Sequence, residues 1–82
     1  MKTDIFSNAI MRRNKISFLY GLSEVVLEPY YLATEKTGRK VIYGRPFNSS
    51  EVKKFEFNRI ANIRVLNGAR FSPLIHISGY VN

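Results

Sequence analysis

The sequence predicts a mainly β fold, in which one N-terminal helix precedes a small, strongly bent antiparallel sheet of five strands that closes into a barrel. Apolar residues recur at helical spacing only near the N-terminus, and from Lys15 onward they alternate with a period of two. Short turn motifs separate five extended segments. Closing such a sheet hides its edges and lets one layer of apolar side chains form the core. The 82 residues are enough for a single domain, so we assign residues 1–82 to one unit.

Residues 4–13 are the predicted helix. Thr3 or Asp4 is expected to cap its N-terminus, and Asp4 also favours the positive end of the helix dipole. A helix of about ten residues is unstable alone, so it must dock on the sheet and cover an open end or face. Its apolar stripe consists of Ile5, Phe6, Ala9 and Ile10.

The predicted strands are residues 15–20, 24–35, 39–47, 52–60 and 61–66. Pro29 cannot donate to a strand ladder, so it indicates an edge, a bulge or a bend within the second strand. Gly38 provides the turn position that tolerates a positive φ. Asn67-Gly68 is a strong turn signal after the fifth strand, and an apolar tail over 71–82 ends the chain.

Composition excludes several classes of protein and makes an enzyme unexpected. Hydrophobic residues are 45% and charged residues 23% of the chain, which is typical of a globular protein rather than a disordered one. No apolar stretch approaches the roughly 20 residues that span a bilayer, and no secretory signal opens the chain, so we expect a cytoplasmic protein without a membrane partner. The chain has no cysteine and only one histidine, His76, and its carboxylates are scattered. We therefore expect no metal, no cofactor and no catalytic residues.

The positive charge is concentrated in the second half of the chain. Thirteen Lys and Arg residues against six Asp and Glu residues give a net charge of +7. Residues 1–35 are neutral in sum, whereas residues 36–70 hold nine basic and two acidic residues. Such an asymmetry favours an anionic partner, for example single-stranded nucleic acid or a nucleotide. A generally basic, soluble surface explains the same composition equally well.

Two sets of cations are candidate ligand-binding residues. Alternation places Arg59 on the face of Phe55, where an unpaired charge would be costly. Either Arg59 and Lys53 line a shallow basic groove that holds phosphate oxygens, or a bulge or a partner such as Glu28 accounts for Arg59. The third strand adds a second set: Arg39, Lys40 and Arg45, with Tyr43 as a stacking surface. The alternative for this set is a solvated exterior whose charges discourage edge association.

Four stretches of the chain occur in a recognisable order. They are Ala9-Ile10 with Ile16-Ser17-Phe18-Leu19-Tyr20, then Leu27-Glu28-Pro29-Tyr30-Tyr31-Leu32, then Phe55-Glu56-Phe57-Asn58-Arg59-Ile60, and finally Phe71-Ser72-Pro73. In this order they resemble the WYL domains of bacterial regulators. The resemblance spans residues 9–73 and implies an Sm-like small β-barrel. It also implies a non-enzymatic sensor with a basic pocket for negatively charged ligands, in transcription regulation or phage defence.

The chain departs from the WYL pattern where the family is most distinctive. The Trp-Tyr-Leu triplet falls on Lys40-Val41-Ile42, so both signature aromatics are missing, and Tyr43 lies one position late. Lys53 stands where the family has Arg, which keeps the charge but not the bidentate fork. The resemblance therefore implies the fold more strongly than the ligand site. The alternative function is a protein-interaction or homo-oligomerisation domain, such as a homodimer, whose pocket has been lost.

Overall fold

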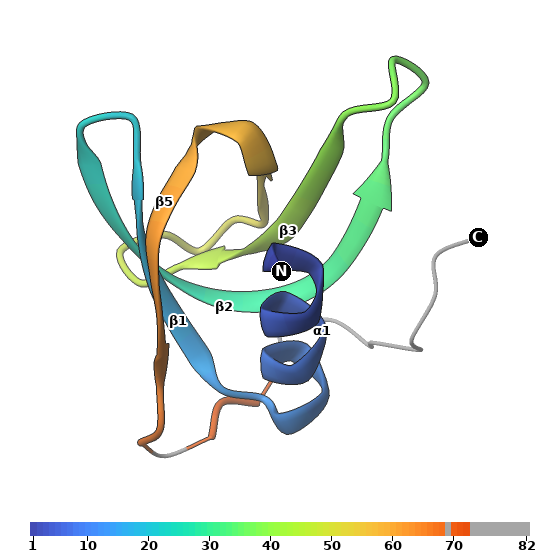
Figure 1. Ribbon diagram of the computed structural model, residues 1–82. Coiled ribbons are helices and arrows are strands. Elements are labelled where there is room, and N and C mark those ends of the chain that lie inside the picture. Colours follow the sequence, from blue (N-terminus) through green and yellow to red (C-terminus); the bar gives the residue numbers. More distant parts are fainter. Residues whose placement is uncertain (69, 73–82) are drawn as a thin grey trace.

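The computed structural model describes residues 1–68 and 70–72 of the chain. One helix is followed by five strands and a short 3₁₀ helix, η1, between the last two strands (Figure 1). In chain order the elements are α1 (Lys2–Arg12), β1 (Lys15–Tyr20), β2 (Ser23–Thr34), β3 (Lys40–Pro46), β4 (Lys53–Glu56), η1 (Phe57–Arg59) and β5 (Ile60–Leu66).

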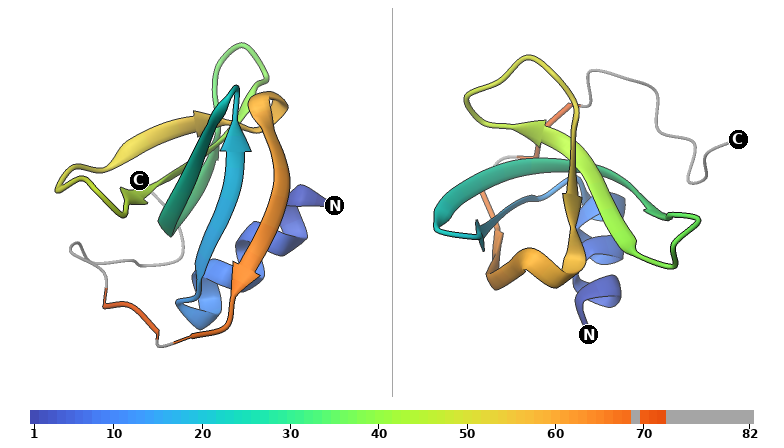
Figure 2. Two further views of the ribbon diagram at one scale, coloured as in Figure 1. Left: turned by 90° about the vertical axis from the view of Figure 1, so that its left-hand side faces the viewer. Right: turned by 90° about the horizontal axis from the view of Figure 1, so that it is seen from above.

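The five strands form one antiparallel sheet in the order β4-β3-β2-β1-β5, which confirms the predicted class of one helix and five antiparallel strands. The sheet is strongly curved (Figure 2). Within the described residues, β4 and β5 do not pair with each other, so the sheet has two edges and is not closed into a barrel by hydrogen bonds. The structure thus has the predicted strands without the predicted closure.

β2 is irregular at Pro29, the residue at which the sequence indicated an edge, a bulge or a bend. The β2–β3 register shifts between Pro29 and Tyr31, so Pro29 marks a bulge. The bulge allows Tyr30 to be fully buried, whereas Tyr31 remains half-buried. β3 crosses this region at Gly44, where an added Cβ would lie 2.4 Å from the Glu28 carbonyl oxygen. A side chain at position 44 would therefore prevent the close approach of the two strands.

The start of α1 and the end of β4 differ most from the predicted boundaries. The helix starts at Lys2, with Met1 as N-cap and no capping side chain, so the prediction of Thr3 or Asp4 as the cap was wrong. The predicted strand over 52–60 was also wrong, because strand pairing ends at Glu56 and η1 follows. Tertiary contacts hold this turn: the Lys2 ammonium donates to the Phe57 carbonyl at 2.6 Å, and the Gly21 amide donates to the Arg59 carbonyl at 3.4 Å.

The core lies between α1 and the concave side of the sheet. Phe6 and Ala9 of α1 are buried in it, as the predicted apolar stripe required. Phe71 is also buried: its ring lies 6.0 Å from that of Tyr30, and its amide donates to the Arg13 carbonyl at 3.1 Å. Residues 73–82 of the predicted apolar tail lie outside the described residues. The buried core cluster is Phe6, Ala9, Ile16, Phe18, Leu27, Ile42, Phe55 and Ile60.

Candidate anion-binding pocket

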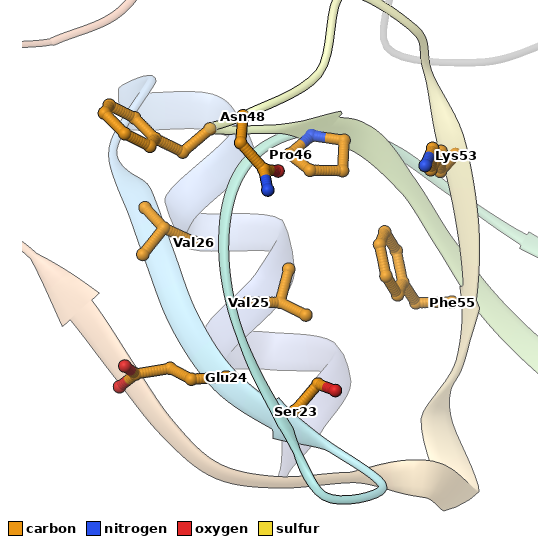
Figure 3. Close-up of a pocket in the computed structure, with 9 residues that line it drawn as sticks. Ser23, Glu24, Val25, Val26, Pro46, Asn48, Lys53 and Phe55 are labelled. Atoms are coloured by element: carbon orange, nitrogen blue, oxygen red, sulfur yellow. The ribbon is translucent and has the colours of Figure 1, made fainter.

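A pocket of about 370 Å³ opens where β3 stops pairing with β2 (Figure 3). The last paired residues are Leu27 and Pro46, while β2 continues beyond them to Ser23. One more bond, from the Phe47 amide to the Val26 carbonyl at 2.7 Å, precedes the turn that leads the chain towards β4. The pocket is lined by Ser23, Glu24, Val25, Val26, Pro46, Phe47, Asn48, Lys53 and Phe55.

The walls of this pocket, called the Lys53 pocket below, combine an apolar surface with one cation. Figure 3 shows Val25, Pro46 and Phe55 around the pocket, with Lys53 beside Phe55 at the start of β4. The Glu24 carboxylate points away from Lys53 in the same view. Lys53 is exposed and forms no ion pair within residues 1–68 and 70–72. The ammonium group is therefore available to an anion.

Arg59 lies next to the Lys53 pocket but does not line it. The guanidinium carbon stands 4.5 Å from the centre of the Tyr20 ring, and Tyr20 packs edge-on at 5.0 Å against Phe55, a wall of the pocket. The expectation that Arg59 falls on the core face was wrong, because η1 interrupts the alternation and leaves the residue exposed. No carboxylate of the described residues pairs with it.

Arg45, a predicted ligand residue, is held by the protein itself. Its Nη2 donates to Glu28 Oε2 at 2.7 Å and its Nε to Glu28 Oε1 at 3.2 Å, while Nη1 donates to the Ser49 carbonyl at 2.9 Å. The Tyr30 hydroxyl donates to the same carboxylate at 3.2 Å. The hydrogen bond to Glu28 raises the pKa of Arg45 above its ordinary value. The guanidinium fork thus binds a buried carboxylate of β2 instead of facing a ligand.

Arg39 and Lys40 lie at the far end of β3 from the Lys53 pocket. Lys53 lies opposite Gly44, and Lys40 is four residues from Gly44 along β3, which corresponds to about 13 Å. Arg39 is exposed and pairs with Glu56 at 3.4 Å, and Lys40 is exposed at the first position of β3. The structure therefore does not bring these two cations together with Lys53.

Tyr43 lies on the opposite face of the sheet from the core. Its ring stacks on that of Tyr31, with centres 4.7 Å apart and planes 25° apart, and both residues are half-buried. Its cross-strand neighbour is Lys54, whose ammonium donates to Glu35 at 2.5 Å. This hydrogen bond raises the pKa of Lys54. Of the predicted patch, Arg39 and Arg45 are thus held in ion pairs and Tyr43 in a tyrosine stack, while Lys40 lies exposed at the start of β3.

Sequence reasoning identified Lys53 but missed the rest of the pocket. Phe55 and Val25 were expected to be ordinary core and strand residues, and Asn48 was expected only in a loop. Pro46 was the available signal, because proline ends the ladder with β2 and so exposes the continuing part of that strand.

Comparisons with protein-family models, with curated proteins and with solved structures gave no match to this chain. Among the described residues, no helix is long and apolar enough to cross a membrane, and no cluster of three potential metal-ligating side chains occurs.

Replacing Arg59 by alanine is expected to weaken anion binding while lowering the free energy of unfolding by only about 0.5–1 kcal/mol, the value of an exposed cation–π contact. Thermal unfolding and titration of a single-stranded oligonucleotide would measure both effects. A large loss of stability with unchanged binding would instead show that Arg59 has a structural role. Arg59→Lys is the control that keeps the charge and removes the planar fork.

Proposed function

We propose that this protein is a non-enzymatic, WYL-like regulatory module that binds an anionic ligand, either nucleic acid or a nucleotide, in bacterial transcription regulation or phage defence. An Sm-like barrel, in which the curved sheet closes by side-chain packing rather than by pairing of β4 with β5, belongs to the same proposal. The succession of a helix and five antiparallel strands supports it, as does the similarity of four stretches to the WYL pattern. A cytoplasmic location follows from such a role.

The observation that carries this proposal is the Lys53 pocket. Arg39, Arg45 and Lys54 are matched by carboxylates, whereas Lys53 forms no ion pair with the described residues and lies beside apolar walls. Lys40 is likewise unpaired among the described residues, but it does not line the pocket. A free ammonium group at a concave site is suited to hold a phosphate or carboxylate of a ligand. Lys53 also occupies the position at which the WYL pattern has Arg.

Replacing Lys53 by alanine is expected to weaken binding of a fluorescent single-stranded oligonucleotide or a labelled nucleotide about tenfold or more, because a charge-assisted hydrogen bond contributes about 1.5–3 kcal/mol. Lys54→Ala is the matched control, since it removes the same charge from the neighbouring residue. Lys54 pairs with Glu35, so its loss is expected to change binding little. Fluorescence anisotropy at several salt concentrations would measure both variants.

Equal losses of affinity in the two variants would indicate that the net charge alone attracts the ligand, which contradicts a role for the pocket. Absence of binding to either probe at low salt would contradict the proposal as a whole. Thermal unfolding of both variants controls for stability. The Tm of each variant is expected to differ little from that of the unmodified protein, because both lysines are exposed.

A homo-oligomerisation domain is the second candidate function. Within the described chain, β4 and β5 are unpaired edges of one antiparallel sheet, and exposed strand edges can pair with another chain. Val65 and Leu66 on β5 are also more than one-third exposed. Sedimentation at several protein concentrations would separate this candidate from the first, since the first requires no self-association.

A further inference from the structure

The size of the Lys53 pocket limits what it can enclose. Its volume of about 370 Å³ is near the lower end of the range for small-molecule sites. It is bounded by the start of β2, the segment after β3 and the start of β4 (Figure 3). One small molecule therefore fits, whereas a run of several nucleotides would have to extend far outside it.

The walls favour a ligand with a flat apolar part. Figure 3 shows Val25 and Phe55 on facing sides of the pocket, with Pro46 above them. The Phe55 ring is fixed by edge-on contacts with Phe18 at 5.5 Å and Tyr20 at 5.0 Å. Phe47 adds a second aromatic wall that is 73% exposed and would lose contact with water when a ligand enters. Phe55 itself is only 7% exposed, so the exposed Phe47 ring is the surface of this pocket on which a base can stack.

The charges near the pocket suit one anionic group rather than many. Lys53 is the one cation among the lining residues. Polynucleotide binding depends on several phosphate contacts, each of which steepens the salt dependence. The other cations of β3 and β4 do not form a continuous track, because Arg45 and Lys54 are paired with carboxylates and Lys40 lies about 13 Å along β3 from Gly44, the residue opposite Lys53.

We infer that the Lys53 pocket binds a single nucleoside monophosphate, with the base between Val25 and the aromatic residues Phe47 and Phe55, and the phosphate at Lys53. This inference rests on the proposed function and narrows it from nucleic acid or nucleotide to one small nucleotide. The Ser23 hydroxyl and the Asn48 amide, both in the lining, supply hydrogen bonds to polar groups of the sugar or base. Because both the base and the phosphate contribute to binding, a nucleoside or a sugar phosphate binds less tightly than the nucleoside monophosphate.

Isothermal titration calorimetry with four probes tests the inference: AMP, adenosine, ribose 5-phosphate and a 15-nucleotide single-stranded DNA. AMP is expected to bind at least about tenfold more tightly than adenosine and than ribose 5-phosphate. Its affinity is expected to fall only weakly with salt, because a mononucleotide lacks the condensed counterions that a polynucleotide releases on binding. Lys53→Ala should reduce AMP binding to the level of adenosine, while Lys54→Ala should leave it unchanged.

Different failures of this experiment have different meanings. Tight binding of the DNA with a steep salt dependence and no competition by AMP would overturn the inference and leave the proposed function standing. Equal affinity for AMP and ribose 5-phosphate would also overturn it, because the flat part would then contribute nothing. If none of the four probes binds at low salt, both the inference and the proposed function are wrong.

Discussion

Replacing Arg45 by alanine is expected to lower the free energy of unfolding by about 3–5 kcal/mol, because it leaves the Glu28 carboxylate buried without its partner. The side chain of Glu28 is only 8% exposed, so water replaces the two lost guanidinium bonds to it poorly, and the Tyr30 hydroxyl remains as a donor to the carboxylate. In a domain of this size the loss corresponds to a fall in Tm of more than about 10 °C. Thermal unfolding followed by circular dichroism would measure it.

Arg39→Ala is the matched control for this prediction. Arg39 also pairs with a glutamate, but its side chain is 58% exposed, and exposed pairs contribute about 0–1 kcal/mol. The two variants remove the same kind of side chain, Arg39 just before β3 and Arg45 near the end of that strand. The opposite result would be an Arg45→Ala variant with an unchanged Tm and a lost affinity for the ligand. In that case the ion pair would not stabilise the fold, and the prediction that Arg45 binds the ligand would stand.

Replacing Gly44 by alanine is expected to destabilise the fold by about 3 kcal/mol, at the upper end of the usual cost of overpacking. The new Cβ would lie 2.4 Å from the Glu28 carbonyl oxygen and 2.8 Å from Leu27 Cγ. One of these contacts is with backbone, so a change of side-chain rotamer cannot relieve it. Chemical denaturation would report the loss as a lower midpoint with an unchanged slope.

Gly68→Ala provides the comparison, since nothing lies within 4 Å of a Cβ at that position and its φ is not positive. Its effect is expected to stay within about 0.5 kcal/mol. Equal stability of the two variants would mean that β2 and β3 can separate at Gly44 without cost, which contradicts the tight crossing of the strands at the bulge.

Local patterns in the sequence were sufficient to predict most of the fold. Alternation from Lys15 to Tyr20 predicted β1 with its observed limits, and Pro29 indicated an edge, a bulge or a bend in β2, of which the structure shows the bulge. The apolar spacing of Phe6 and Ala9 predicted the face of α1 that enters the core. These signals are local, because each depends on the period of a single element or on the missing amide of proline.

Features that depend on distant residues could not be predicted in the same way. Alternation continues through Phe57 and Arg59, yet contacts with Lys2 and Gly21 accompany a 3₁₀ turn there. Arg45 was indistinguishable from a free cation, because Glu28 faces it only through the register of β2 and β3. The candidate site was predicted in part: Lys53 lines the pocket, but the walls around it come from three strands that meet only in the fold.

The strand order also has a consequence for how this molecule folds and opens. Strands β1, β2 and β3 each pair with the next strand in the chain, whereas β5 returns to β1, so that Val65 lies opposite Ile16. Closing so long a loop costs more entropy than forming the hairpins, which favours late docking of β5 and its early release. Every residue that lines the Lys53 pocket lies before β5. Release of the far end of β5, where Val65 pairs with Ile16, would therefore remove no lining residue from the pocket.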